Sequence, residues 1–346
     1  YDITWRNIMS LAQLEKTLKL DIKAALGCTE PITIALATCK ARRMAGENIK
    51  KISLRLSTNL LKNAMEVGIP GTSGQRGIPL AAALGCYSLK ETPGLTLLEN
   101  MNEEWLGRAR DLVARDLITI DLAGEKHGLF IDALVEDDQN NTGRCIIAGS
   151  HENCILLEKN GETVFSSTSC GENQSGEVLR EREALARLSF KEIWNNITDL
   201  SPELRERMLN GIAMNLKVAK AGLDKDGFLN IGNIYNQLII DGWLGNDVIN
   251  KAKALTSAAV DARMSGCDLP VMTSAGSGNQ GLTISLPLHV LAEHLKADDR
   301  KLSEALAISH GITSILKHHS GTLSAMCGCV VCSGTGLTAG ATYLLG

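Results

Sequence analysis

The sequence lacks the features that mark membrane, secreted and nucleic-acid-binding proteins. No run of about 18 apolar residues is present, so no membrane-spanning helix is predicted. The first residues show no signal-peptide pattern. Aromatic residues make up only 3% of the chain, the net charge is -4, and no Lys- or Arg-rich stretch is interleaved with aromatics. We therefore expect a cytoplasmic protein with no membrane or nucleic-acid partner, acting on a small molecule.

The chain also lacks a complete metal-binding motif. Its ten cysteines are spread irregularly, which favours core thiols plus a few reactive or metal-binding ones. The segment CGCVVC at 327–332 is a C-x-C-x2-C pattern that stands alone, so it fails as a zinc site. One or two of its thiolates could serve an iron–sulfur cluster that is completed from distant segments. We interpret His310, His318 and His319 as surface or hydrogen-bonded side chains rather than ligands.

Length and periodicity predict an α+β protein that is mainly α-helical. A chain of 346 residues with 44% hydrophobic residues can form one large domain or two unequal ones. Short alternating runs between 116 and 166 predict an antiparallel meander. We assign residues 1–110 together with 172–346 to a helical catalytic domain, and 111–171 to an inserted β-rich subdomain. The other predicted elements are helices at 5–26, 29–46, from 78 and at 102–115, a strand at 51–57, and helices capped at Ser201-Pro202 and Asp298-Asp299.

Cys28 is predicted to lie at the entrance of a helix. It precedes Thr29, a suitable N-cap residue, and Pro31, which suits a first turn. The positive end of the helix dipole stabilises a thiolate, so Cys28 could act as a base or nucleophile. The alternative is a small buried thiol with no chemical role.

Two glycine-rich loops precede apolar helices and suit an anion. The first is GIPGTSGQRGIP at 68–79, and the second is GSGNQGL at 276–282. The second matches the dinucleotide fingerprint G-x-G-x-x-G, but the preceding residues predict no strand and no βαβ unit. Free backbone N–H groups at a helix start would suit a carboxylate as well as a phosphate. The alternative for both loops is a turn needed only for capping or tight packing.

Together, several motifs resemble one family: the iron–sulfur L-cysteine desulfidases and their uncharacterised relatives. More distantly, the chain is similar to the catalytic part of iron–sulfur L-serine dehydratases. The resemblance implies a pyridoxal-independent β-elimination that converts L-cysteine to pyruvate, ammonia and hydrogen sulfide, with a 4Fe-4S cluster as Lewis acid. The motifs that carry it are GCTEPITIALA, VGIPGTSGQRGIPLAAALG, the stretch from DARMSG to GSGNQGLTISLP, and LSAMCGCVVCSGTG.

The resemblance also implies roles for single residues. Cys28 matches the cysteine that removes the substrate α-proton, and Cys327 matches the first of three cluster ligands. In the family the other two ligands lie further along the chain than Gly346, so we expect the natural protein to continue; Cys329 is a weaker alternative ligand. Hydrogen-bonding chemistry suggests substrate contacts from side chains of the two glycine-rich loops. These are Thr72, Ser277, Asn279 and Gln280.

Three other functions stay open on the residues alone. An L-serine dehydratase, or an ammonia-lyase for another β-substituted amino acid, would use the same cluster and base. A cluster-free regulatory protein would keep only the amino-acid-binding pocket. A pyridoxal phosphate lyase would need an active-site lysine, for which Lys62 is the nearest option. The oligomeric state is also open, with a homo-oligomer among the options.

Overall fold

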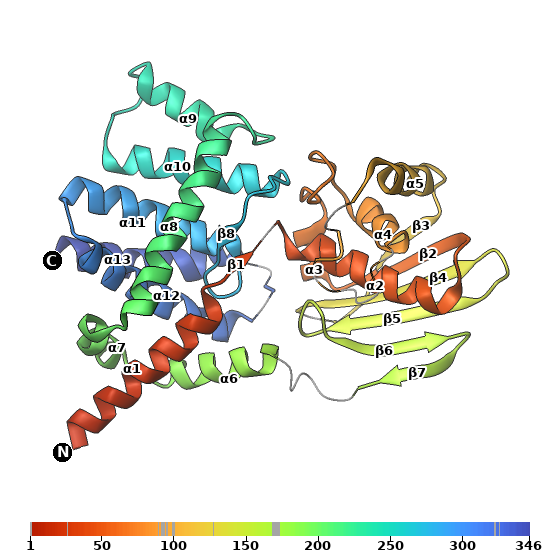
Figure 1. Cartoon of the computed structure of the whole chain (residues 1–346), viewed down its shortest axis with the longest axis horizontal. Helices are drawn as coiled ribbons and strands as arrows, with labels where there is room; N and C mark the ends of the chain where they lie inside the picture. Colours follow the sequence, from red (N-terminus) through yellow and green to blue (C-terminus); the bar gives the residue numbers. More distant parts are fainter. Residues whose placement is uncertain are drawn as a thin grey trace. The chain divides into compact units, whose positions relative to one another are not determined.

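The computed structural model describes residues 2–25, 27–88, 90, 94, 96–98, 101–126, 128–167, 174–321, 323–324 and 326–346. Its contacts divide the chain into two compact units. The helical unit comprises residues 1–26, 176–321 and 326–346, and the sheet unit comprises 27–175 and 322–325 (Figure 1). Among the described residues, no helix is long and apolar enough to span a membrane. The mainly helical α+β class expected from the sequence is confirmed.

This division differs from the predicted domain boundaries. Residues 27–110 were placed with the helical domain, but they group with the strands. The reason is that a strand from this stretch lies inside the sheet and a helix from it covers the sheet. The predicted boundary between 171 and 172 lies outside the described residues.

The sheet unit contains a six-stranded mixed sheet with strand order β3-β2-β4-β5-β6-β7. Strands β4 to β7 form the antiparallel meander that the sequence predicts. The prediction was wrong for the first strand of the meander: β3 pairs parallel with β2, and β2 in turn pairs antiparallel with β4. The bounds are β2 Ile49–Leu56, β3 Ile118–Leu122, β4 Phe130–Asp137, β5 Thr142–Ala148, β6 Cys154–Lys159 and β7 Glu162–Ser166.

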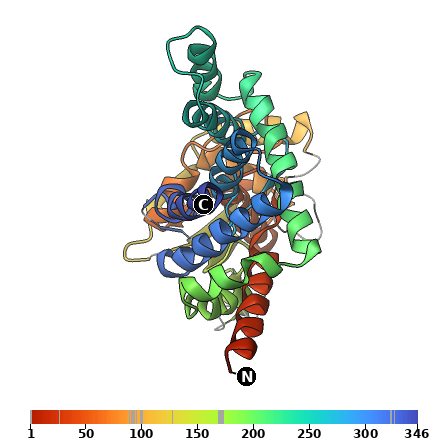
Figure 2. The ribbon, with the colours of Figure 1, turned by 90° about the vertical axis from the view of Figure 1, so that its left-hand side faces the viewer.

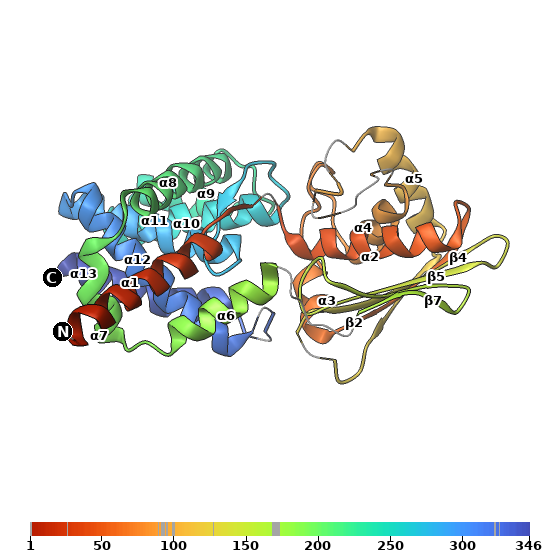
Figure 3. The ribbon, with the colours of Figure 1, turned by 60° about the horizontal axis from the view of Figure 1, so that its bottom comes forward.

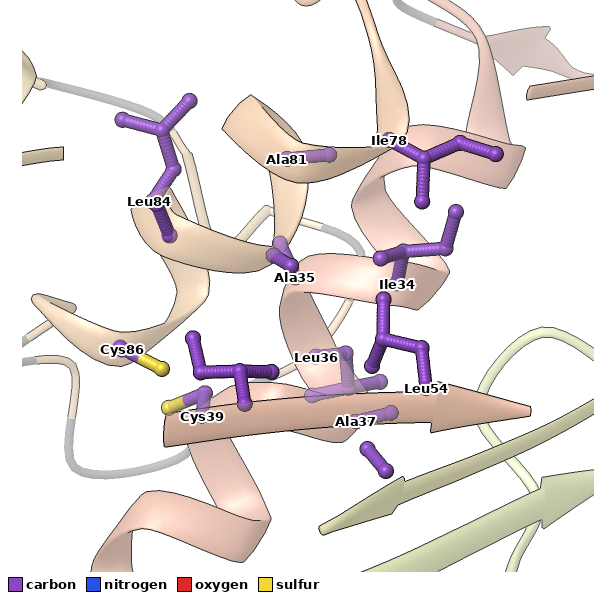
Figure 4. Close-up of a cluster of buried hydrophobic side chains, with 14 of the residues drawn as sticks. Ile34, Ala35, Leu36, Ala37, Cys39, Leu54, Ile78, Ala81, Leu84 and Cys86 are labelled. Atoms are coloured by element: carbon purple, nitrogen blue, oxygen red, sulfur yellow. The ribbon is translucent and has the colours of Figure 1, made fainter. Parts of the chain in front are cut away.

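Helix α2 covers one face of this sheet, with α4 packed on α2 (Figure 3). A Cβ atom on Gly143 of β5 would overlap the backbone carbonyl of Ala41, so α2 sits directly against the strand. Alternate residues of the strands, such as Leu54, meet Ile34 and Leu36 of α2 in a dry core (Figure 4). The helices of this unit are α2 Thr29–Ala45, α3 Thr58–Ala64, α4 Ile78–Cys86 and α5 Glu103–Ala114.

The helical unit packs long helices around α12, most of whose residues are buried (Figures 1 and 2). The predicted starts at Ser201-Pro202 and Asp298-Asp299 are confirmed, and Asp298 caps α12 by accepting from the Lys301 N–H at 2.7 Å. The two short strands β1 and β8 pair antiparallel beside the helices. The elements are α1 Asp2–Asp21, β1 Ala24–Ala25, α6 Gln174–Ala186, α7 Phe190–Asn196, a 3-10 turn Ile197–Asp199, α8 Pro202–Leu223, α9 Ile231–Ile240, α10 Val248–Met264, β8 Val271–Met272, α11 Gly278–Leu295, α12 Asp299–Ser320, a π-helix Cys329–Gly334 and α13 Thr335–Leu345.

Candidate functional site

Cys28 lies at the entrance of α2, as the sequence predicts, one position before the expected N-cap. Its backbone is extended, it is itself the N-cap residue, and its side chain makes no capping hydrogen bond. Instead the buried thiol donates to the Glu30 carboxylate, two residues further on. The hydroxyl of Thr29 lies 3.1 Å from Nε2 of His151. The thiol therefore has a carboxylate as its proton acceptor, and the next residue along the chain contacts an imidazole.

The glycine-rich loop at 68–79 lies against this entrance. A Cβ atom on Gly27, whose φ of +62° also favours glycine, would overlap the ring of Pro70. The close approach of these two residues joins the GCTEP and GIPGT motifs within the sheet unit. This contact gives Gly27 a steric reason to be glycine.

Thr72 is fully buried inside this loop rather than pointing out of it. Its hydroxyl donates to the carbonyl of Ile69 at 2.6 Å and lies 3.3 Å from that of Gln75. The Gln75 amide in turn donates to the Thr72 carbonyl, so the loop is held by its own side chains. Since the Thr72 proton is committed, a substrate contact there would use only a hydroxyl lone pair, which suits an ammonium better than a carboxylate.

The second loop forms the start of α11 in the helical unit. Backbone bonds between Ser274 and Ser277 close a tight bridge, and Gly276 between them has a φ of +75°. Ser277 is the N-cap residue, and its hydroxyl makes no capping bond. A two-residue strand, β8, precedes the loop, which the sequence did not predict. It pairs antiparallel with β1 rather than within a βαβ unit.

The two amides that follow are held differently. Asn279 accepts from Arg263 Nη1 at 2.9 Å, and its Nδ2 lies 3.1 Å from the Met264 sulfur. Gln280 is 3% exposed, and its Oε1 accepts no hydrogen bond from the described residues. A buried acceptor in this state costs free energy unless a ligand supplies a donor.

Gln280 also brings the loop to the cysteine motif. A Cβ atom on Gly328, between Cys327 and Cys329, would overlap the Gln280 side-chain amide, and it would lie 3.7 Å from Nζ of the buried Lys317. Glycine is therefore required at 328 for this close approach. The predicted substrate loop and the predicted cluster ligand are thus neighbours within the helical unit.

The three cysteines of CGCVVC differ in their surroundings. Cys327 is exposed, Cys329 is half-buried and Cys332 is buried. Burial, with the neighbouring Cys327 thiol adding to it, raises the pKa of Cys329 to about 11. Cys332 lies 3.5 Å from the Ser320 hydroxyl. Of these three thiols, Cys327 is the most exposed.

A complete cluster site is absent from the described part of the chain. No group of three His, Cys, Asp or Glu side chains there could hold a metal ion. A cluster bound by three cysteines therefore fits these residues only in part, with Cys327 as one ligand.

A buried ion pair lies beside the loop, and sequence reasoning missed it. Asp21 ends α1 and accepts from Nε and Nη2 of Arg182 on α6 at 2.6–3.0 Å, and from the Ser314 hydroxyl at 2.6 Å. Thr273 donates to the Asp21 carbonyl, which links the pair to the loop. Nothing in the sequence marks these residues, because they come from three helices far apart along the chain.

His310 was predicted to be a surface or hydrogen-bonded side chain, and the second alternative is correct. It is buried on α12, and its Nδ1 lies 2.8 Å from the hydroxyl of Ser274. Burial lowers the pKa of His310 to about 3, so the ring is neutral at physiological pH. Ser274, two positions before the loop, is therefore held by an uncharged imidazole.

The predicted site residues thus fall into two groups. Cys28 and Thr72 belong to the sheet unit, whereas Ser277, Asn279, Gln280 and Cys327 belong to the helical unit. Within the helical unit, buried polar side chains converge on one loop and helix start. Such an arrangement is typical of a binding site for a small polar molecule.

Comparison with known proteins identifies the class of this chain. The profile of the serine dehydratase alpha chain family matches residues 126–346, which include the loop at 276–282 and CGCVVC. The chain therefore belongs to the serine dehydratase alpha chain family. The match begins after Cys28 and the first glycine-rich loop, so it bears on the helical unit most directly.

UPF0597 proteins are among the curated relatives that are similar to this chain. Those of Clostridioides difficile (strain 630) and Clostridium tetani (strain Massachusetts / E88) are each 36% identical, and that of Alkaliphilus metalliredigens (strain QYMF) is 37% identical. The alignments cover 95–96% of this chain and 73–76% of the relatives. No solved structure matches the chain significantly. The predicted resemblance to uncharacterised relatives and to serine dehydratases is confirmed.

Proposed function

We propose that the protein is a pyridoxal-independent β-elimination lyase for a small L-amino acid, with L-cysteine as the first candidate substrate and L-serine as the second. The observation that carries the proposal is the contact of Gln280 with Gly328. This close approach supports the proposal, because we expect the loop to bind an amino-acid head group and Cys327, next to Gly328, to bind the cluster. The serine dehydratase family supports the reaction class.

The reaction removes two groups from neighbouring carbons. A base takes the α-proton, the Cβ–S bond of L-cysteine breaks, and sulfide leaves with a proton as hydrogen sulfide. The resulting 2-aminoacrylate tautomerises to an imine, which water hydrolyses to pyruvate and ammonium. With L-serine the Cβ–O bond breaks instead and water leaves.

Cys28 is our candidate for the base. Its thiol must lose a proton before it can accept one from the substrate, and the Glu30 carboxylate already accepts that hydrogen bond. The start of α2 stabilises the thiolate that remains. Glu30 therefore acts through Cys28 as a positioning residue that also accepts its proton.

In the helical unit, the start of α11 and Ser277 donate to the substrate carboxylate, while Gln280 Oε1 accepts from its ammonium group. Asn279, whose side-chain oxygen accepts a hydrogen bond from Arg263, is a further substrate contact from this loop. Cys327 would be one ligand of a 4Fe-4S cluster. When bound, the cluster supplies a Lewis-acid iron for the leaving sulfur or oxygen.

The test is the full-length gene product purified anaerobically, with iron and acid-labile sulfide counted per chain and pyruvate release measured from L-cysteine and L-serine. About four irons per chain with turnover of either amino acid support the proposal. The faster substrate decides between desulfidase and dehydratase. An iron-free protein that still binds amino acids, but does not turn them over, would instead support the cluster-free regulatory alternative.

Single variants separate the base from the ligand. Cys28→Ala should lower kcat about 10²- to 10⁴-fold with iron unchanged, as expected for loss of a general base. Cys327→Ala should lose the iron as well. The control is Cys267→Ala, a half-buried thiol of the helical unit with no assigned role, which should keep both. Joint loss of iron and activity in Cys28→Ala would make Cys28 a ligand or a folding residue.

A further inference from the structure

In the ion pair of Asp21 and Arg182, only one edge of the Arg182 guanidinium donates hydrogen bonds to the carboxylate. Arg182 is 5% exposed, and it contacts Asp21 through Nε and Nη2, the side edge of its guanidinium. The end edge, made by Nη1 and the second Nη2 proton, contacts no acceptor among the described residues. An arginine can bind one carboxylate at each edge, because it carries five N–H donors in a planar fork.

The end of this guanidinium lies beside the substrate loop. A Cβ atom on Gly276 would be 3.5 Å from Nη2 of Arg182, and Gly276 itself is exposed. Solvent and small solutes can therefore approach the loop where the guanidinium lies. The following residues, Ser277 and Gly278, begin an 18-residue helix, whose N-terminus adds positive potential.

A second buried group at the same helix start points to the chemistry of the ligand. Gln280 Oε1 is an acceptor with no donor among the described residues, four positions after Gly276. Arg182 and the helix start thus offer donors to an anion, while Gln280 offers an acceptor to a cation. This combination matches a zwitterionic α-amino acid, with its carboxylate and ammonium held apart.

We propose that Arg182 binds the α-carboxylate of the amino-acid substrate through its end edge, and that Asp21 fixes the guanidinium for this task. The inference rests on the proposed function and deepens it. Asp21 is a positioning residue, because it contacts Arg182 and Ser314 and not the ligand. The buried Asp21 carboxylate holds one edge of the guanidinium through hydrogen bonds from Nε and Nη2. Because the guanidinium is already fixed, it loses little conformational freedom when the ligand binds to its other edge.

The experiment is isothermal titration of the full-length protein with L-alanine, which has no β-leaving group and so binds without turnover, and with L-alaninamide, which has no carboxylate. Wild-type protein should bind L-alanine at least tenfold more tightly than L-alaninamide. Arg182→Lys, which keeps the charge beside Asp21 but has no fork, should lose this preference. Arg144→Met breaks an ion pair with Asp132 in the sheet unit and should leave it unchanged.

Three outcomes would overturn the inference. These are equal affinity of wild-type protein for the two ligands, an unchanged preference in Arg182→Lys, and no binding of L-alanine at all. Failure of the proposed reaction would differ from these outcomes. A protein that fails to turn over L-cysteine and L-serine, yet binds L-alanine through Arg182, would keep this inference and refute the lyase.

A different observation carries a second inference, on the surface of α9. Large apolar side chains are exposed over residues 228–249, including Trp243, which is 80% exposed. Ile231, Ile234 and Leu238 share one face of α9, while Gly232 packs on α10 at another. We call this exposed set the α9 patch. It comprises Phe228, Leu229, Ile231, Ile234, Leu238, Ile240, Trp243 and Ile249.

We infer that the α9 patch binds a second copy of this chain. Eight such side chains each expose on the order of 100 Å², which together match the ~800 Å² that each partner buries in a standard interface. An anionic membrane or nucleic acid is a poorer occupant, because residues 224–247 contain four aspartates and one lysine. A second copy carries the same patch, so two copies related by a two-fold axis can bury the patch of each against that of the other.

The test is the molar mass of the full-length protein by light scattering. Wild-type protein should be a dimer, and Ile234→Glu together with Trp243→Glu should give folded monomers. Val164→Glu replaces an equally exposed residue on β7 and should remain dimeric. A wild-type monomer, or a double variant that stays dimeric, would overturn the inference.

Discussion

His310 makes the stability of the helical unit depend on pH in a way that can be calculated. Burial lowers the pKa of its imidazole to about 3, against about 6.5 in the unfolded chain. Since the folded pKa is the lower one, the contribution is fully present above pH 6.5 and is lost as the pH falls from 6.5 towards 3. The unfolded state binds a proton that the folded state excludes, which costs about 1.4 kcal/mol per pH unit in this window.

Between pH 7.5 and pH 5 this group alone should lower the free energy of unfolding by about 2 kcal/mol. His310→Gln removes the titration and keeps a polar side chain that can bond Ser274. Urea unfolding followed by circular dichroism should therefore show a pH dependence weaker by that amount in His310→Gln. The control His294→Gln, which replaces an exposed histidine, should behave like wild type. Equal pH slopes in wild type and His310→Gln would refute the assignment of a buried, neutral imidazole.

Three further predictions concern packing, thiol reactivity and capping. Gly85→Ala should lower the free energy of unfolding in urea by about 1–3 kcal/mol, because the added Cβ would overlap a backbone carbonyl of α2. The control Gly107→Ala, at a position with open space around it, should be neutral or stabilising. Equal effects of the two substitutions would contradict the packing of Gly85 against α2. Iodoacetamide should alkylate the exposed Cys327 well before Cys86, because burial raises the pKa of the Cys86 thiol to about 12. Mass spectrometry would show the order of alkylation, and the reverse order would contradict the burial of Cys86. Asp298→Ala should cost about 1 kcal/mol by removing the cap of α12, and an unchanged unfolding midpoint would argue against that cap.

Much of the local structure could be predicted from the sequence, because it depends on neighbouring residues. Helix starts at 201–202 and 298–299 follow from capping residues, and the alternating run near 51–57 gives β2. The position of β2 between β3 and β4 could not be predicted. Pairing between strands some sixty residues apart depends on tertiary contacts that no local pattern encodes.

The candidate site divides in the same way. Motifs that have a local sequence pattern, such as the loop at 276–282 and CGCVVC, are neighbours in the helical unit. The groups that surround them, Asp21, Arg182 and His310, carry no local signal. Their role depends on burial and on partners from other helices, which only the folded chain shows.

The position of β2 between β3 and β4 decides which parts of the chain can fold alone. A fragment of residues 111–171 would contain β3 to β7 without the strand that joins β3 to β4. Its remaining strands would lose the α2 cover and expose the apolar face that now meets Ile34 and Leu36. The β-rich region therefore cannot be excised or transplanted as a module unless β2 and α2, the helix that carries Cys28 at its start, are taken with it.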